Sequence, residues 1–268
     1  MEIEGLLLLG CGKMGSALLR GWLAGGLPPD RAFVTEPQPS VWLLESGVGV
    51  NQPLEGMSVD ICVLAIKPQM MAEALETVRS LRGPDTVILS IAAGITLGHL
   101  AEVFGAETPV VRAMPNTPAA IGCGISAYVG NAAARENHLS LAAELLGAVG
   151  QTVLLTREAD IDCVTGVSGS GPAYVFYLIE TLARAAEDSG LAADIAMSLA
   201  VETVAGAGQL ARCASETPEE LRRNVTSPRG TTEAALRHLM DPDTGLQPLV
   251  KRTVMAAISR SEELGRRE

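Results

Sequence analysis

The sequence has few aromatic residues and little positive charge. Its 268 residues include two Trp, three Tyr and three Phe, and 20 Lys and Arg stand against 31 Asp and Glu, giving a formal net charge of −11. Duplex nucleic acids and anionic membranes attract basic surfaces, and single strands stack on exposed aromatic rings. The composition therefore argues against a protein that binds nucleic acid or an anionic membrane.

The spacing of cysteine and histidine excludes further classes of protein. Five cysteines are scattered without a C-x-x-C pair, and the three histidines, His99, His138 and His238, stand far apart. A disulfide scaffold or a zinc site needs closer residues. The first residues lack the basic segment of a signal peptide, and no apolar run reaches the roughly 18 residues of a membrane span. We therefore expect a reduced, cytoplasmic protein with no metal and no membrane span.

Hydrophobic residues make up 47% of the chain, and their pattern changes near residue 157. Before it, short apolar runs alternate with segments of helical periodicity. The pattern predicts strands over 3–10, 32–36, 60–66, 86–91, 109–113 and 124–130, and helices over 13–24, 69–81, 97–104 and 134–147. Runs as continuously apolar as ICVLAI are typical of parallel strands buried on both faces. This half is therefore predicted to be an α/β domain with a doubly wound parallel sheet of the Rossmann type.

Beyond residue 157 the sequence shows only helical periodicity. Apolar positions fit helical stripes over 175–186, 196–211 and 250–258, and Thr217-Pro218 is typical of an N-cap followed by the first residue of a helix. We predict a Rossmann domain over 1–158 and an all-helical domain over 159–268. The helices are rich in Ala and Gly and bury little apolar area, so we expect a second copy of the chain to complete their core.

A glycine-rich loop follows the first predicted strand and opens the first predicted helix. It reads G-x-G-x-x-G, with glycines at Gly10, Gly12 and Gly15 and with Cys11, Lys13 and Met14 between them. In this setting the first glycine makes a tight turn, the second lets a pyrophosphate approach, and the third packs helix on strand. The free N–H groups of the helix start would meet the phosphates. The alternative is a glycine-rich turn that binds nothing.

Glu36 ends the second predicted strand, twenty-one residues after Gly15. An acidic residue at this place accepts hydrogen bonds from the adenosine ribose hydroxyls of NAD. No Arg or Lys occurs in the surrounding segment FVTEPQPSVW to receive the 2′-phosphate of NADP. The sequence therefore favours NADH. The alternative is a solvated glutamate at the end of a strand.

Three further loops carry candidate site residues. Ala65, Ile66, Lys67 and Pro68 follow a buried strand, where they would lie beside a cofactor or form an ordinary turn. Asn116, in a loop with two prolines, would orient a nicotinamide or substrate, or cap the turn. The hydroxyls and glycine of residues 226–232 precede a predicted helix, whose N–H groups would bind a carboxylate. The alternative is plain N-capping, which the spacing alone favours.

Six motifs together resemble one family. The segments GCGKMG, AIKPQ, SIAAGIT, RAMPNTPA, TGVSGSGPAY and NVTSPRGTTEAAL follow one another as in pyrroline-5-carboxylate reductase, from residue 6 to about 241. The resemblance implies hydride transfer from a nicotinamide nucleotide to the imine carbon of 1-pyrroline-5-carboxylate, which gives L-proline. It also implies a Rossmann domain, a helical dimerisation domain, and homodimers that assemble into larger rings.

The resemblance also implies roles for individual residues. The phosphate loop is matched by residues 10–15, the second cofactor segment by residues 65–68, and a ribose-contacting asparagine by Asn51 or Gln52. The segment that holds the substrate is matched by Asn224, Val225, Gly230, Thr231 and Thr232, with Glu216 at a nearby acidic position. Thr232 matches the threonine whose hydroxyl meets the substrate nitrogen.

Two positions depart from the family pattern. Arg229 replaces the first glycine of S-P-G-G, where a positive φ would strain an arginine. Glu36 replaces the polar or basic residues with which many relatives accept NADPH. The resemblance thus implies NADPH as the common cofactor, whereas Glu36 itself favours NADH.

Two other functions are compatible with parts of the sequence. One is a ketone reductase of the 6-phosphogluconate-dehydrogenase-like kind, for which Lys251 or His238 would be the acid. The other is a regulatory protein that binds a nucleotide without turnover, and Arg229 is its only support.

Overall fold

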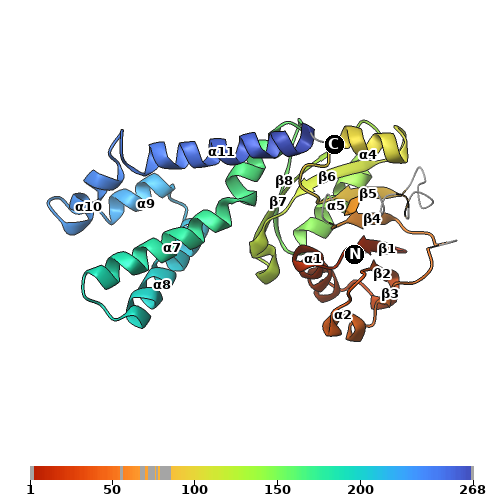
Figure 1. Cartoon of the computed structure of the whole chain (residues 1–268), viewed down its shortest axis with the longest axis horizontal. Coiled ribbons are helices and arrows are strands. Elements are labelled where there is room, and N and C mark those ends of the chain that lie inside the picture. Colours follow the sequence, from red (N-terminus) through yellow and green to blue (C-terminus); the bar gives the residue numbers. More distant parts are fainter. Residues whose placement is uncertain are drawn as a thin grey trace. The chain divides into compact units, whose positions relative to one another are not determined.

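The computed structural model describes residues 3–54, 57–66, 70, 71, 76, 78 and 86–266 (Figure 1). They form two compact units, the first comprising Met1–Gly169 and Ala257–Glu268 and the second Ser170–Ala256. The predicted boundary between residues 158 and 159 lies eleven residues before the division at Gly169. The two positions differ because α6 (Asp160–Val164) belongs to the first unit, where Ile161 is fully buried in the core of the sheet.

The C-terminal end of the chain also returns to the first unit. Helix α11 (Leu246–Arg266) crosses from one unit into the other at Ala257. Within the first unit, the Ser261 hydroxyl donates a 2.6 Å hydrogen bond to Asp162 Oδ1, and Leu264 lies beside Gly94. Helical periodicity predicts α11 but does not show what its last turns contact.

The first unit contains one eight-stranded sheet in the order β3-β2-β1-β4-β5-β6-β7-β8. Its strands are β1 (Leu6–Leu9), β2 (Ala32–Thr35), β3 (Gly49–Val50), β4 (Ile61–Leu64), β5 (Val87–Ser90), β6 (Val110–Met114), β7 (Gly124–Gly130) and β8 (Gly150–Leu154). Neighbouring strands pair in parallel, except that β6 and β7 are antiparallel. The predicted Rossmann-type doubly wound sheet is therefore confirmed.

Three features of the sheet were not predicted. The short strand β3 and the edge strand β8 lack the continuous apolar run of a buried strand, and β8 is largely exposed. Strand β7 runs antiparallel because the connection from β6 is too short for a crossover, which needs about a dozen residues or more. That connection contains only the 3₁₀ helix Thr117–Ile121 and short flanking turns.

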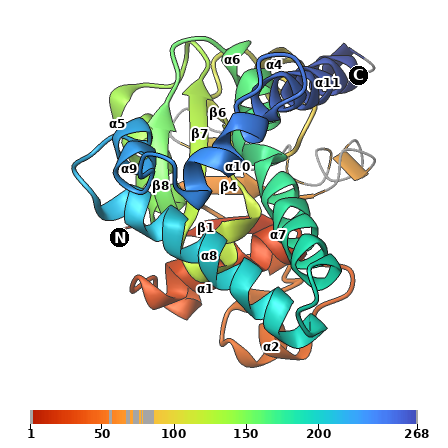
Figure 2. The same cartoon turned by 90° about the vertical axis from the view of Figure 1, so that its left-hand side faces the viewer.

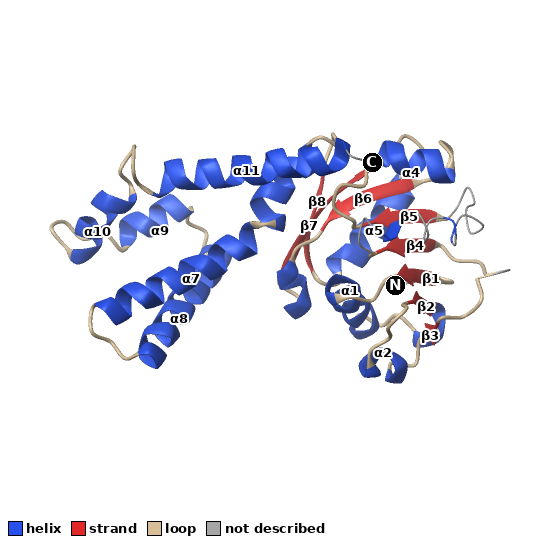
Figure 3. Cartoon of the chain, viewed as in Figure 1, coloured by secondary structure: helices blue, strands red, loops and turns tan. Residues whose placement is uncertain are grey.

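Helices cover both faces of the sheet (Figure 3). Successive strand residues point to opposite faces, so Leu6 and Leu8 join one buried cluster and Leu7 and Leu9 the other. Residues of α1 (Lys13–Ala24), α2 (Val41–Glu45) and α5 (Glu136–Gly147) pack on the first face, and those of α4 (Leu97–Phe104) and α6 on the second. The predicted bounds of α1 and α4 are confirmed, whereas most of the predicted helix 69–81 lies outside the described residues.

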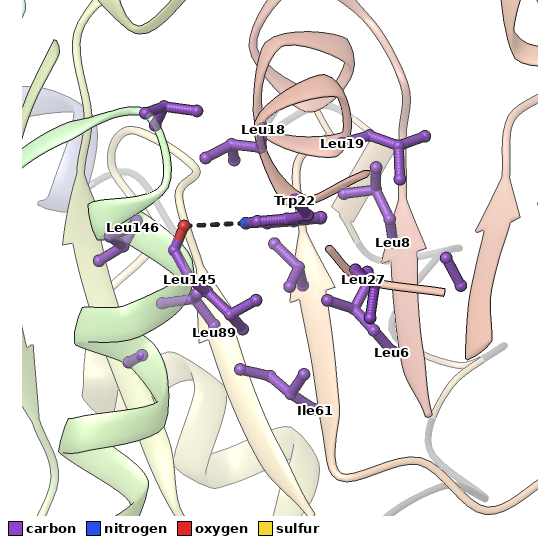
Figure 4. Packing of buried hydrophobic residues seen from close by; sticks show 14 of the residues in the cluster. Leu6, Leu8, Leu18, Leu19, Trp22, Leu27, Ile61, Leu89, Leu145 and Leu146 are labelled. Carbon is purple, nitrogen blue, oxygen red and sulfur yellow. Dashed lines mark hydrogen bonds between the residues drawn. The ribbon is translucent and has the colours of Figure 1, made fainter. Parts of the chain in front are cut away.

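Trp22 joins α1 to α5 through the core (Figure 4). Its indole is fully buried among leucines of the first cluster, and its Nε1 donates a 2.8 Å hydrogen bond to the Leu145 carbonyl oxygen. A buried indole N–H needs such a partner, because leaving it without one costs free energy. The contact holds the C-terminal half of α1 and thereby helps to position its N-terminus at the edge of the sheet.

The second unit is helical, as predicted (Figures 1 and 2). It contains α7 (Gly171–Asp188), α8 (Ala193–Cys213), α9 (Pro218–Asn224), α10 (Thr231–Leu239) and the first part of α11. Helices α7 and α8 form an antiparallel pair. Thr217 caps α9 through a capping box with Glu220, which confirms the predicted helix start.

Large apolar side chains of this unit remain exposed. On α7 and α8 they are Val175, Phe176, Tyr177, Leu178, Leu182, Ile195, Met197, Leu199, Val201 and Leu210. So many exposed apolar side chains on two paired helices are typical of a protein–protein contact. Among the residues that the structure describes, none of the helices is both long and apolar enough to cross a membrane, and no cluster of metal-binding side chains occurs.

Candidate functional site

Gly10 and Gly15 are required by close packing. Gly10 follows β1 with φ of +86°, and a Cβ atom at this residue would lie 2.7 Å from the Ala65 carbonyl oxygen. A Cβ atom at Gly15 would overlap the carbonyl oxygen of Gly10. The first glycine therefore permits the turn and the third permits the contact between helix and strand, as the motif predicts.

Gly12 is not required by packing. It is the N-cap of α1, with φ of −66°, and a Cβ atom at this residue would have no neighbour within 4 Å. No side chain caps α1, and no acidic residue lies in its first turn. Free N–H groups at a helix start, beside open space, fit a pyrophosphate. Lys13 is exposed in this turn, and Met14 is partly buried against the core.

Glu36 lies against the glycine-rich loop. Its Oε2 accepts a 2.7 Å hydrogen bond from the Cys11 N–H, and its Oε1 accepts a 3.0 Å bond from the Gln38 N–H. The carboxylate therefore joins the end of β2 to the loop after β1. A carboxylate oxygen accepts more than one hydrogen bond, so these contacts leave acceptor capacity for the ribose hydroxyls of a dinucleotide.

Asn51 holds the main chain of Glu36. Its Oδ1 accepts from the Glu36 N–H at 2.9 Å, and its Nδ2 donates to the Glu36 carbonyl oxygen at 3.0 Å. The residue has φ of +52°, a conformation that asparagine tolerates better than most residues. Its amide thus fixes the place of Glu36, and its direct contact with a ribose stays a prediction.

The Cys11 thiol is neutral at neutral pH. Burial and the negative charge of Glu36 raise its pKa to about 11, and the positive charge of Arg20 partly offsets this rise. The thiol therefore adds no negative charge to the candidate phosphate site.

The loop after β4 is described only in part. Ala65 and Ile66 are partly buried, and the Ala65 N–H donates a 2.8 Å hydrogen bond to the Leu9 carbonyl oxygen. Ala65 therefore lies beside the glycine-rich loop, as expected of a cofactor segment. Lys67 and Pro68 lie outside the described residues, and their roles stay predictions.

Asn116 connects three segments of the first unit. Its Oδ1 accepts a 2.9 Å hydrogen bond from the Ile125 N–H, and its Nδ2 donates a 3.2 Å bond to the Ser168 carbonyl oxygen. The amide thereby joins the end of β6 to β7 and to the π-helical turn Thr165–Gly169. Of the two predicted roles, these contacts support holding the turn. A contact with nicotinamide or substrate stays a prediction.

The predicted substrate segment forms one turn of the second unit. Asn224 ends α9 and Val225 follows it, both exposed, while Gly230 is the N-cap of α10. Thr231 and Thr232 lie in the first turn of α10, which no side chain caps. The N–H groups of this turn are therefore available to an anion such as a carboxylate. Glu216 is exposed just before the start of α9, at the other end of that helix from Asn224, and its contact with the substrate stays a prediction.

Arg229 adopts the backbone conformation that the family glycine implies. Its φ is +60°, and its N–H donates to the Glu233 carboxylate one turn further along. A non-glycine residue in the left-handed region costs about 1–2 kcal/mol. A Cβ atom at the next residue, Gly230, would overlap the Ser227 hydroxyl. The predicted substrate loop therefore keeps a left-handed residue despite the arginine, and a side chain at residue 230 would require Ser227 to move.

Sequence reasoning missed two contacts near these loops. Arg112 of β6 is buried and pairs at 2.8 Å with Glu158, whose Oε1 also accepts the Leu97 N–H at the start of α4. A charged residue within the apolar motif RAMPNTPA was a signal for a buried ion pair. Arg20 lies over the ring of Trp42, 3.6 Å from its centroid, and no local pattern connects these two residues.

The fold and the loop geometry define a dinucleotide-binding oxidoreductase of the Rossmann class. Family models agree with this class. Residues 6–94 match the model described as NADP oxidoreductase coenzyme F420-dependent, and residues 158–264 match the model described as pyrroline-5-carboxylate reductase dimerisation.

Relatives of known name match along the whole chain. The pyrroline-5-carboxylate reductase of Pseudomonas aeruginosa is 38% identical over 98% of both chains, and that of Pisum sativum is 35% identical over 96% of this chain and 94% of its own. A solved structure of the Coxiella burnetii enzyme has a TM-score of 0.91 at 31% identity, covering 98% of this chain and 99% of its own. The Plasmodium falciparum enzyme with NADP bound has a TM-score of 0.85 at 28% identity and covers 99% of both chains.

This chain belongs to the pyrroline-5-carboxylate reductase family, a family of nicotinamide-dependent oxidoreductases. The resemblance noted in the sequence is confirmed, and so is its implication of a helical dimerisation domain.

We predict that Gly12→Ala separates nucleotide binding from folding. The backbone at Gly12 suits alanine, so the free energy of unfolding should fall by no more than about 1 kcal/mol, the cost of a poorer N-cap. The methyl group would occupy the space that a pyrophosphate needs, so the Kd for NADH should rise about tenfold or more. Calorimetric titration and thermal unfolding measure the two effects.

Gly15→Ala is the matched control. Its methyl group overlaps the Gly10 carbonyl oxygen and should lower the free energy of unfolding by roughly 3 kcal/mol. A Gly12→Ala variant that binds NADH as tightly as the natural chain would contradict the placement of the phosphate site.

Proposed function

We propose that the chain reduces the cyclic imine 1-pyrroline-5-carboxylate to L-proline with NADH or NADPH, as the last step of proline biosynthesis. The observation that carries this proposal is the match over 98% of both chains to a relative named for this reaction. Membership of this family also argues against the two alternative functions, a ketone reductase and a nucleotide-binding protein without turnover.

The reaction needs a hydride donor, a bound imine and a proton. A bound nicotinamide nucleotide would supply the hydride to the imine carbon, while the electron pair of the C=N bond moves to nitrogen and nitrogen takes up a proton. Within the first unit, the N–H groups at the start of α1 would bind the pyrophosphate and Glu36 would bind the adenosine ribose. The chain thus contributes position and electrostatic stabilisation to the reaction.

The start of α10 supplies the substrate-binding groups. The free N–H groups of Thr231 and Thr232 bind the substrate carboxylate, supported by the helix dipole. The Thr232 hydroxyl donates a hydrogen bond to the substrate nitrogen. A neutral hydroxyl is a poor acid, so water or an already protonated imine supplies the proton. Asn224, Val225 and Glu216 complete the proposed substrate segment.

The exposed apolar faces of α7 and α8 support a homodimer, which assembles further into a ring. Exposed apolar side chains that lie together are typical of surfaces that bind another protein. The family model that matches this part of the chain is a dimerisation model. We further propose that the protein is cytoplasmic. Light scattering measures the mass of the assembly, and a monomer at micromolar concentration would contradict this proposal.

Glu36 is proposed to favour NADH over NADPH. Its carboxylate would repel a 2′-phosphate, whereas it accepts hydrogen bonds from both ribose hydroxyls. In Glu36→Ala the ratio of kcat/KM for NADH to that for NADPH should fall about ten- to a hundredfold, the equivalent of one charge-assisted hydrogen bond. A natural chain that already prefers NADPH strongly would show that Glu36 does not select the cofactor.

The assay for the function follows the loss of NADH absorbance when the imine is added. We predict that Thr232→Ala lowers kcat/KM about ten- to a hundredfold, equal to about 1.5–3 kcal/mol of transition-state stabilisation. The Kd for NADH should hardly change, because the nucleotide-binding loops lie in the first unit. If the natural chain causes no imine-dependent loss of NADH or NADPH absorbance, the proposed function itself is refuted.

Thr232→Ser is the control for the Thr232 hydroxyl. It keeps the hydroxyl and should recover most of the rate. A purely structural role would instead lower the thermal stability of the Ala variant and leave its turnover normal. Full activity in Thr232→Ala would remove this residue from the reaction.

A further inference from the structure

Arg20 is held in a defined place on the first unit. Its guanidinium carbon lies 3.6 Å from the centroid of the Trp42 ring. Arg20 comes from α1 and Trp42 from α2, which follows Glu36 after a short loop. Stacking on an aromatic face uses the plane of the guanidinium and leaves the N–H groups along its edge free to donate. The stack therefore presents an oriented set of donors beside the start of α2, the helix that follows Glu36.

Among the described residues, no ion pair neutralises the charge of Arg20. In the part of the chain that the structure describes, no carboxylate lies within ion-pair distance of its guanidinium, and the residue is exposed. An exposed arginine without a carboxylate partner remains available to a ligand anion.

Arg20 and Glu36 act on the same residue of the glycine-rich loop. The Cys11 N–H donates to Glu36, and the Cys11 thiol is influenced by the negative charge of Glu36 and the positive charge of Arg20. Glu36 therefore contacts the loop directly, and Arg20 lies near enough for its charge to offset part of the rise in the pKa of the Cys11 thiol. The segment 33–42 itself contains no Lys or Arg. A phosphate at this place would find its cation on α1.

We propose that Arg20, oriented by Trp42, binds the 2′-phosphate of NADPH at the adenosine site. This inference rests on the nucleotide site of the proposed function and adds a second specificity residue to it. Glu36 accepts hydrogen bonds from the ribose hydroxyls of NADH and repels the 2′-phosphate of NADPH, whereas Arg20 attracts that phosphate. The two charges together make the discrimination between NADH and NADPH moderate, and each can be removed separately.

The test uses two probes that fill only the adenosine site, 2′,5′-ADP and 5′-AMP. Calorimetric titration gives their Kd values for the full chain and for Arg20→Ala, Glu36→Gln and the double variant. Arg20→Ala should raise the Kd of 2′,5′-ADP about tenfold and change the Kd of 5′-AMP by less than about twofold. Glu36→Gln should lower the Kd of 2′,5′-ADP, and adding Arg20→Ala to that variant should reverse the gain in affinity.

Arg135→Ala is the matched control. It removes the same charge from an exposed arginine at the start of α5, at the opposite edge of the sheet from the glycine-rich loop. Equal losses of 2′,5′-ADP binding in Arg135→Ala and Arg20→Ala would reveal an effect of net charge and overturn the inference. The inference is also overturned if Arg20→Ala changes the Kd of both probes equally or changes neither. It is overturned as well if the Glu36→Gln variant does not bind 2′,5′-ADP.

The probes also separate this inference from the proposed reaction. Neither probe carries a nicotinamide, so their binding does not depend on imine reduction. A chain without imine reduction that still shows the expected Kd changes would refute the reaction and support the role of Arg20. An active reductase whose Kd values do not respond to Arg20→Ala would refute the role of Arg20 alone.

Discussion

The nucleotide site depends on how closely the start of α1 approaches the end of β1. The approach is possible because Gly10 and Gly15 have no side chains, and because Gly10 adopts a positive φ that reverses the chain. Near its other end, α1 is held by Trp22, which fills the space against α5 and donates to Leu145. Held at both places, the helix presents its free N–H groups at a fixed point on the edge of the sheet, where a pyrophosphate fits.

Opposite charges surround this point. Glu36 is fixed through its carboxylate by the Cys11 N–H and through its main chain by Asn51, while Arg20 is fixed by its stack on Trp42. None of these contacts is made by neighbours in sequence. The proposed roles of these two residues make cofactor choice a balance between a carboxylate that suits a ribose diol and a guanidinium that suits a phosphate.

The second unit offers main-chain N–H groups at one helix start and leaves much of its apolar surface exposed. The start of α10 offers uncapped N–H groups, and the loop before it keeps a left-handed residue although Arg229 stands where the family has glycine. The loop therefore preserves its backbone geometry and accepts a conformational cost of about 1–2 kcal/mol. Helices α7 and α8, in turn, leave apolar side chains exposed that a dimerisation domain can bury.

The sequence by itself determined the features that local patterns encode: the apolar runs of β1 and β4, the bounds of α1, the Thr217 cap and the glycine-rich loop. Each depends on residues within a few positions of one another. Only the tertiary structure decided the direction of β7, the return of α11 to the first unit, and the contacts of Asn116. It also brought Arg20 to Trp42 and Glu158 to Arg112. These contacts join residues that are distant in sequence, so they follow from how the sheet and its helices pack and leave no periodic pattern along the chain.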